Sequence, residues 1–291
     1  MNHLDFFDKW TPESAWVYGL ILGDGHIHCS DKGGTIHFVG NEDTVNKYNA
    51  LLGIDKKVSK GKVWLTYIYN KELALWFRRR GIQAKKSTSL IWPKDIKGDL
   101  LVHFLRGLAD TDGSFSFCNR EHKGRDYFRF GFSSATEEFA EKARNNFQCP
   151  HKLSSNVKKM NGKEFTQYSF QFSGLNDSIP ALDRIYANAP LHLRNEERYN
   201  KYLCAKAMFK EYQLPCVLCS KPRHSGELCT EHMHDQKKKD WPCEGCSVLI
   251  HGLIPQFCCA CIYRSIRLLK NPSLKTRVRR TPKPSIRFPI R

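Results

Sequence analysis

The sequence predicts an α+β protein of two similar halves, followed by a small cysteine-rich module. One apolar stretch occurs twice, at residues 16–25 (WVYGLILGDG) and 104–113 (FLRGLADTDG), and each copy opens a run of elements in the order α-β-β-α-β-β-α. A second copy at a distance of roughly 90 residues is typical of a duplicated domain. The cysteines supply a third observation, because eight of the twelve lie between Cys216 and Cys261.

Length and composition are compatible with this organisation, since 291 residues with 41% hydrophobic content can bury two cores. We expect five segments: a first half (1–84), a linker (85–98), a second half (99–212), the cysteine-rich module (213–262) and a basic tail (263–291). No apolar run reaches the about 18 residues of a membrane span, and the N-terminus lacks a secretory signal. We therefore expect an intracellular protein, in the cytoplasm, the nucleoid or an organelle matrix.

The charge of the chain indicates its partner. The formal net charge is +18 and the pI is near 9.4, which predicts binding to a polyanion. Membranes and acidic proteins are alternatives, but no basic amphipathic anchor stands out, so nucleic acid is favoured. Its affinity should then fall steeply as salt concentration rises, because binding releases counterions.

The elements of the first half follow from local signals. Residues 11–14 (TPES) mark a helix start with Thr11 as N-cap, and this helix runs into Gly25. Segments rich in β-branched and aromatic residues predict strands. The remaining elements that we expect are strands at 26–29, 35–39 and 62–69 and helices at 43–52 and 71–80.

The linker has no clear hydrophobic period and contains Pro93, and the second half then repeats the pattern. We expect helices at 100–111, 137–147 and 175–187 and strands at 114–118, 127–133, 153–159 and 165–172. A further helix, rich in Arg and Lys, is expected at 192–211 and leads to the cysteine-rich module.

Small residues form one stripe on each of the two repeated helices. Ala15, Gly19 and Gly23 recur every four residues in the first copy, and Gly107 and Thr111 repeat that spacing in the second. A glycine inside a helix costs about 1 kcal/mol relative to alanine. Close approach of two helix backbones would offset this cost, because a missing Cβ lets the axes come nearer. We therefore expect the two stripes to face each other.

Such packing would bring two carboxylates together. Asp24 and Asp112 would lie side by side at the helix C-termini, and Gly25 and Gly113 would act as left-handed residues that end each helix. Two carboxylates beside the negative ends of two helix dipoles repel each other unless a cation lies between them. The pair therefore predicts a divalent-metal site.

These residues carry a resemblance to a known family. The segments 17–25 (VYGLILGDG) and 105–113 (LRGLADTDG) resemble the paired signature of LAGLIDADG homing endonucleases. The resemblance implies a saddle-shaped, single-chain enzyme that cuts both strands of a long, non-palindromic DNA site. It also implies that the eighth signature position, here Asp24 and Asp112, coordinates catalytic Mg²⁺ shared by two neighbouring active sites.

Two details accompany the resemblance. The sixth signature position is Asp110 in the second copy but Leu22 in the first, and we expect this departure to matter little because the chemistry needs the eighth position. The backbone at Gly23 and Thr111 is a weaker candidate for Mg²⁺ ligation. The family's basic residue near the metals matches no clear motif in this sequence.

The strands of the second half predict a base-reading face. Phenylalanines at 128, 130 and 132 alternate with polar residues, and a second aromatic series does so at 168, 170 and 172. A period of two places the aromatics against helices and Arg129, Gln167 and Gln171 on the opposite face. Arg can bind guanine and Gln adenine in the major groove, although a solvated sheet face is the alternative. Weaker candidates are Lys62, Trp64 and Thr66 in the first half.

Basic residues elsewhere suggest phosphate contacts. Lys85 and Lys86 lie in the linker, where the resemblance implies a phosphate-contacting loop and a solvated basic loop is the alternative. The chain after Cys261 has ten Lys or Arg, three prolines between 280 and 290, and no Asp or Glu. We expect an extended arm along phosphates or in a minor groove, with a disordered tail as the alternative. The DNA-binding candidates in this basic tail are Arg264, Arg267, Lys275, Arg277, Arg279 and Arg280.

The cysteine-rich module predicts two structural zinc sites. Cysteine pairs spaced i, i+3 offer two thiolates to one tetrahedral zinc at about 2.3 Å, and a full set of four leaves no open position for catalysis. Zinc binding would supply much of the folding free energy of the module. The first set is Cys216, Cys219, Cys229 and His232; the second is Cys243, Cys246, Cys258 and Cys261. The two sets could interleave, or the cysteines could be unpaired core residues.

The function expected from these features is a monomeric, Mg²⁺-dependent, site-specific DNA endonuclease that serves intron homing. One alternative is an RNA-splicing maturase or a DNA-binding regulator that has kept the fold and lost cleavage. Another is a plain zinc-stabilised DNA-binding protein, which leaves the duplicated signature unexplained. Met1 is no splicing nucleophile and the chain ends Pro-Ile-Arg rather than His-Asn, so we do not expect an intein.

Overall fold

The structure is a computed structural model that describes residues 3–55, 58–60, 63–82, 89–120, 125–160, 162–212, 240–242 and 249–251. Met1–Cys118 and Tyr127–Glu211 form one compact unit, which contains both copies of the repeated helix. Asn119–Asp126 and Tyr212–Arg291 form a second unit. Most of the second unit lies outside the described residues.

The first half has the predicted order of elements around a four-stranded antiparallel sheet with strand order β1-β2-β4-β3. Thr11 caps α1 as predicted, because its Oγ1 accepts from the backbone N–H of Ser14 while Ser14 Oγ accepts from the backbone N–H of Thr11. A short 3-10 helix (Asp5–Phe7) comes first. The elements are α1 (Pro12–Asp24), β1 (Gly25–Ser30), β2 (Gly33–Gly40), α2 (Glu42–Leu52), β3 (Val58–Lys60), β4 (Val63–Tyr69) and α3 (Lys71–Arg79).

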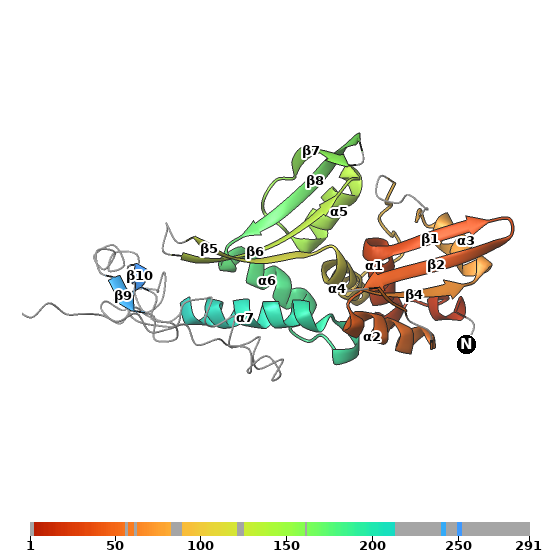
Figure 1. Ribbon diagram of the computed structural model, residues 1–291, viewed down its shortest axis with the longest axis horizontal. Coiled ribbons are helices and arrows are strands. Elements are labelled where there is room, and N and C mark those ends of the chain that lie inside the picture. The colour runs from red at the N-terminus through yellow and green to blue at the C-terminus, as the bar shows by residue number, and fades with distance from the viewer. Residues whose placement is uncertain are drawn as a thin grey trace, which may run out of the picture. The chain divides into compact units, whose positions relative to one another are not determined.

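The second half repeats that order with strand order β5-β6-β8-β7, so the duplicated α-β-β-α-β-β-α arrangement is confirmed (Figure 1). Its elements are α4 (Asp99–Thr111), β5 (Ser114–Arg120), β6 (Arg125–Ser134), α5 (Glu137–Phe147), β7 (Ser154–Met160), β8 (Lys163–Ser173) and α6 (Leu175–Tyr186). A 3-10 turn (Leu191–Leu193) and α7 (Glu196–Tyr212) follow. In the second unit, β9 (Asp240–Pro242) pairs antiparallel with β10 (Leu249–His251).

The helix predicted at 192–211 starts later than expected. Residues 191–193 form the 3-10 turn, and α7 begins after Asn195, whose side-chain oxygen accepts from the backbone N–H of Arg198. An Asn at this position is a strong helix N-cap, so the cap rather than the charge pattern sets the start of the helix.

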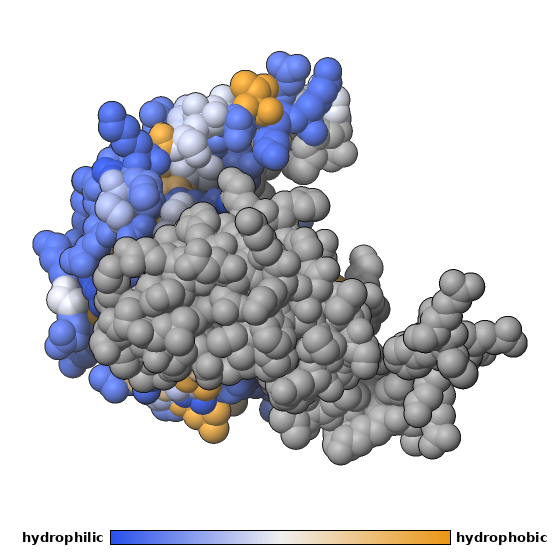
Figure 2. All heavy atoms as spheres, turned by 90° about the vertical axis from the view of Figure 1, so that its left-hand side faces the viewer, coloured by the Kyte–Doolittle hydropathy of each residue, from blue (hydrophilic) through white to orange (hydrophobic). Residues whose placement is uncertain are grey.

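Aromatic side chains fill the core beneath the second sheet. Phe130 and Phe172 stack with ring centroids 5.5 Å apart, and Phe132 lies 5.9 Å from Phe170 across the same strand pair. All four are buried, which confirms the predicted alternation of β6 and β8. On the face of the molecule that Figure 2 shows, the described residues are mainly hydrophilic. Every helix in the described part of the chain is too short or too polar to cross a bilayer.

Candidate metal centre and nucleic-acid interface

The two repeated helices pack through their glycines. A Cβ atom on Gly19 would lie 2.5 Å from the carbonyl oxygen of Phe104, and one on Gly107 would lie 2.3 Å from the carbonyl oxygen of Trp16. Both distances are far inside van der Waals contact, so neither position has room for a side chain. The prediction that the two stripes face each other is confirmed, and Figure 1 shows α1 and α4 side by side.

This contact brings the two signature carboxylates to one end of the helix pair. A Cβ on Gly23 would overlap Thr111, whose Oγ1 donates to the carbonyl oxygen of Gly107 at 3.1 Å. Gly23 and Thr111 therefore face each other one residue before Asp24 and Asp112. Asp24 ends α1, Asp112 caps α4, and both side chains are exposed.

The glycines after these aspartates have a different role from the predicted one. Gly25 has φ −79° and ψ 153°, and Gly113 is not among the glycines with positive φ, so the prediction of left-handed helix ends was wrong. Instead, α1 passes directly into β1, and α4 is followed by β5 after two residues. A Cβ on Gly25 would lie 2.5 Å from the carbonyl oxygen of Ile21, and one on Gly113 would lie 2.3 Å from that of Ala109. Close approach of the chain to the last helical turn therefore requires glycine at both positions.

The donor set at this end suits a hard divalent cation. Among the described residues, no group of three or more His, Cys, Asp or Glu side chains could by itself hold a metal ion. Mg²⁺ is usually bound through one or two carboxylates, with waters and substrate phosphate oxygens completing an octahedral shell. Two exposed carboxylates brought to one end of a helix pair match this pattern. Ligation by the backbone of Gly23 or Thr111 stays a prediction.

Asp110, at the sixth position of the second signature copy, is buried in the core. Its carboxylate accepts hydrogen bonds from Trp16 Nε1 at 2.8 Å, Tyr186 Oη at 2.5 Å and the backbone N–H of Asn195 at 3.0 Å. The Asn195 side chain in turn donates to Thr44 Oγ1 in α2 at 2.9 Å. The sixth signature position therefore joins α1, α4, α6 and α2, a role that the sequence interpretation missed.

Burial makes Asp110 sensitive to pH. Desolvation raises its pKa from 3.8 to about 6, although its three hydrogen bonds act in the opposite direction. A raised native pKa means that the folded state binds more protons than the unfolded state between these values. Stability attributable to Asp110 is therefore present below pH 4 and is lost as the pH rises through 6.

Asp110→Asn should remove this pH dependence, because the amide has a similar shape and does not titrate. Its oxygen can accept from Trp16 and Asn195, and its NH2 group can donate to Tyr186 Oη, which would change from donor to acceptor. The rise in pKa from 3.8 to about 6 corresponds to about 3 kcal/mol, so the stability of the variant relative to wild type should increase by that amount between pH 4 and pH 8. Urea unfolding across this range in EDTA measures the difference. A difference that does not change with pH would contradict this assignment.

The three residues predicted to read bases lie on one face of the second sheet. Gln171 stands opposite Gly131 and Arg129 opposite Ser173, on the side of the sheet away from the buried phenylalanines. Gln167 shares this face and donates to Ser133 Oγ at 3.0 Å. The predicted placement is therefore as expected, while their contact with bases stays a prediction.

The prediction for the first sheet chose the wrong face of β4. Thr66 is completely buried, and Trp64 lies on the same side of the strand, facing the core. The open side of the sheet instead presents His26, His37 and Tyr67, which are paired across three strands. The ring centroids of His26 and His37 are 5.9 Å apart, and those of His37 and Tyr67 are 6.1 Å apart. The alternation of histidines at positions 26 and 28 was the signal that could have identified this face.

His37, at the centre of this row, carries little positive charge at neutral pH. Burial lowers the pKa of His37 below its ordinary value of 6.5, and the neighbouring His26 and His28 lower it further. His37 is therefore mainly neutral at pH 7.

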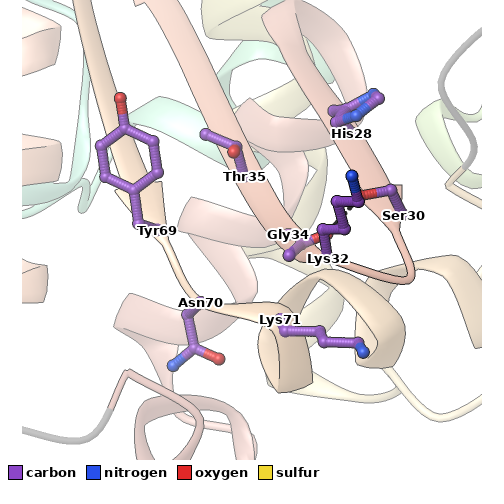
Figure 3. Close-up of a pocket in the computed structure, with 9 residues that line it drawn as sticks. His28, Ser30, Lys32, Gly34, Thr35, Tyr69, Asn70 and Lys71 are labelled. Atoms are coloured by element: carbon purple, nitrogen blue, oxygen red, sulfur yellow. Dashed lines mark hydrogen bonds between the residues drawn. The ribbon is translucent and has the colours of Figure 1, made fainter.

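A basic pocket of about 490 Å³ lies at the end of the same face (Figure 3). Lys71 begins α3, and its Nζ donates to the carbonyl oxygen of Asp31 at 2.7 Å, while Lys32 belongs to the turn between β1 and β2. Its lining is His28, Ser30, Lys32, Gly33, Gly34, Thr35, Tyr69, Asn70 and Lys71. Two ammonium groups beside hydroxyl and amide groups suit a phosphate, and the sequence interpretation missed this pocket.

Several predicted site residues lie outside the described residues. They are Lys62, Lys85 and Lys86, the zinc candidates Cys216, Cys219, Cys229, His232, Cys243, Cys246, Cys258 and Cys261, and the tail residues Arg264, Arg267, Lys275, Arg277, Arg279 and Arg280. Their roles stay predictions.

Comparison with known proteins gives similarities of limited extent. No protein-family model matches the chain. The chain is similar to the replication factor C small subunit of Methanocaldococcus jannaschii, with 27% identity over 188 residues that cover 60% of this chain. The matched region spans 9% of that protein's length.

Among solved structures, the chain is similar to the LAGLIDADG homing endonuclease I-GzeII in complex with its DNA target (TM-score 0.47, 12% identity, 69% of this chain and 90% of that one). It is also similar to the LAGLIDADG meganuclease I-AabMI bound to uncleaved DNA (TM-score 0.45, 12% identity, 69% and 92%). A third is I-DmoI in complex with DNA and Mn (TM-score 0.35, 15% identity, 60% and 96%). At these TM-scores and identities the similarity is remote.

Proposed function

We propose that the chain is a divalent-metal-dependent endonuclease of the LAGLIDADG homing type, which binds a long, non-palindromic DNA duplex as a monomer and cuts both strands. The observation that carries this proposal is the packing of α1 against α4, which brings Asp24 and Asp112 to one end of the helix pair. One carboxylate comes from each half. A duplex bound across both halves would then meet one carboxylate for each strand.

The residues of this chain would act by holding and orienting the reacting groups. Asp24 and Asp112 would hold Mg²⁺, which supplies activated water and stabilises negative charge on the phosphate in the transition state. The glycine contact fixes the helix ends, which would limit the reorganisation of the two carboxylates on DNA binding. Arg129, Gln167 and Gln171 would set the register of the duplex by binding base edges.

The experiment that tests this function is a cleavage selection on a long randomised duplex library with Mg²⁺, run beside a reaction with EDTA. The expected result is one extended consensus, cut on both strands only when Mg²⁺ is present. Enrichment of a bound sequence without any cut would instead indicate a non-cleaving DNA-binding regulator, and RNA splicing would then be the next assay.

The basic pocket on the first sheet should bind backbone phosphate. Replacing both Lys32 and Lys71 by Gln removes two cations from its rim, so the slope of log affinity against log salt should become shallower by about 2. Affinity should fall by a similar factor for specific and non-specific duplexes, because phosphates carry no sequence information. Fluorescence anisotropy at several salt concentrations measures both quantities.

Lys142→Gln is the matched control for this prediction, since Lys142 is an exposed lysine on α5, which packs against the other side of the second sheet. The control should leave the salt slope unchanged. Equal slopes for the pocket variant and the control would contradict phosphate binding at the pocket.

We also propose that the cysteine-rich module binds two structural zinc ions, on the strength of the spacing of its two ligand sets. Elemental analysis of the purified chain should find about two zinc per chain, as two complete four-ligand sets require. Cys216→Ser and Cys243→Ser should each lose one. A zinc content that neither substitution changes would contradict the proposed ligands.

A further inference from the structure

The open faces of the two sheets differ in their chemistry. On the second sheet, the outward positions are hydrogen-bonding groups, with Ser154 paired to Ser169 and Asn156 paired to Gln167 across the strands. On the first sheet, an apolar row takes the corresponding place. Val39 pairs with Leu65, and Leu65 pairs with Val58 on its other side.

The apolar row lies on the open side of its sheet. Thr66 faces the core and is completely buried, so Leu65 points the other way, as do its partners in the register. Val58 and Val63 are 47% and 43% exposed, so both are hydrophobic side chains at the surface. Val39, Leu65 and Val58 are cross-strand neighbours, whose Cβ atoms lie about 5 Å apart in an antiparallel sheet. Val63 lies two residues before Leu65 on the same face of β4, so the four side chains form one strip.

The surroundings of this strip favour duplex DNA as its occupant. The strip belongs to the sheet that starts at Gly25, directly after the metal-binding candidate Asp24. The basic pocket, with Lys32 and Lys71, lies at the end of that same face. The chain as a whole carries a net charge of +18. A face that runs from a metal centre to a phosphate pocket on a strongly basic chain is complementary to a polyanion rather than to an apolar protein partner.

We propose that Val39, Leu65, Val58 and Val63 read thymine, so that the half of the target bound by the first half of the chain is defined by thymine methyl groups, whereas the second half reads its half-site through hydrogen bonds. The physical reason is that the thymine C5-methyl is the apolar group that base edges present in the major groove. This inference rests on the proposed function, because it needs duplex DNA to bind across both sheets.

The test replaces thymine by deoxyuridine, which removes the methyl group and keeps base pairing. A duplex obtained by binding selection in Ca²⁺ is prepared with deoxyuridine in one half-site, in the other, or in neither. Leu65→Ala and Gln171→Ala identify which half-site each half of the chain contacts, by the positions at which each variant loses selectivity. Affinity is then measured for every pair of protein and duplex.

Deoxyuridine in the half-site of the first sheet should weaken binding by about fourfold for each methyl removed, as expected for loss of one buried CH₂-sized group. In the other half-site it should change affinity less than twofold. For Leu65→Ala, the affinities for the thymine and deoxyuridine duplexes should be more nearly equal. Val157→Ala is the matched control, because Val157 is exposed on the side of the second sheet opposite to its base-reading face. It should keep the full difference in affinity.

The outcomes separate this inference from the function on which it rests. If a duplex is selected and deoxyuridine has equal or no effect in the two half-sites, thymine reading by the first sheet is wrong and the nuclease proposal stands. If the selected half-site contains no thymine, the inference is also wrong. If no duplex is enriched at all, both proposals fail together.

Discussion

Asp24→Asn and Asp112→Asn should each lower the rate of DNA cleavage by about a thousandfold, the size of effect seen when one transition-state-stabilising group is removed. An amide oxygen is a much weaker Mg²⁺ ligand than a carboxylate, so the site loses cation affinity where charge develops. Both side chains are exposed at the end of the helix pair, and neither contributes to the core. Single-turnover cleavage with saturating protein measures the rate.

DNA affinity provides the internal control for this prediction. Measured in Ca²⁺, the affinity of both variants should stay within about threefold of wild type, because phosphate contacts spread along the duplex supply most of the affinity. Asp8→Asn, at an exposed position beside the short 3-10 helix before α1, should cleave as wild type does. Full cleavage by either signature variant would overturn the two-carboxylate mechanism, whereas loss of both binding and cleavage would indicate misfolding.

Gly107→Ala should destabilise the protein strongly even though alanine favours helices. The substitution gains about 1 kcal/mol of intrinsic helix propensity. It also places a Cβ 2.3 Å from the carbonyl oxygen of Trp16 and 3.0 Å from Gly19 Cα, and both are backbone atoms that cannot move without separating the helices. Overpacking of this kind costs about 3 kcal/mol or more, so the clash exceeds the propensity gain. Urea unfolding measures the net loss.

Gly33→Ala is the matched control, because a Cβ at this position meets nothing within 4 Å and the backbone φ is not positive. It should unfold within about 0.5 kcal/mol of wild type, as surface substitutions usually do. Any Gly107→Ala protein that folds should also cleave more slowly, since α1 and α4 carry the two carboxylates. Equal stability of Gly107→Ala and wild type would contradict the close helix contact.

Parts of the site could be predicted from the sequence because their cause is local. The four-residue spacing of Gly19 and Gly23 places them on one helix face whatever surrounds the helix. The alternation of Phe130 and Phe132 with polar residues likewise fixes which side of β6 is buried. For the same reason, Thr11 could be identified as a cap from the residues next to it.

Other parts could not be predicted, because their cause is distant in the chain. Strand β4 is aromatic or apolar on both sides, so alternation alone does not choose a face, and the packing of α2 against it decides that Thr66 is buried. A glycine after a helix, as at Gly25 and Gly113, usually predicts a left-handed helix end. Neither glycine is left-handed here, because a strand follows each helix and Gly25 is already extended.

By itself, the sequence determined that this protein has two copies of one α-β-β-α-β-β-α unit, with an aspartate at the end of each leading helix, because periodicity and capping are properties of neighbouring residues. Only the tertiary structure decided that Asp110 is a buried acceptor, since its donors Trp16, Tyr186 and Asn195 lie 94, 76 and 85 residues away. The same holds for the open face of the first sheet. Burial is a property of the assembled fold, and a side chain is desolvated only when distant elements pack over it.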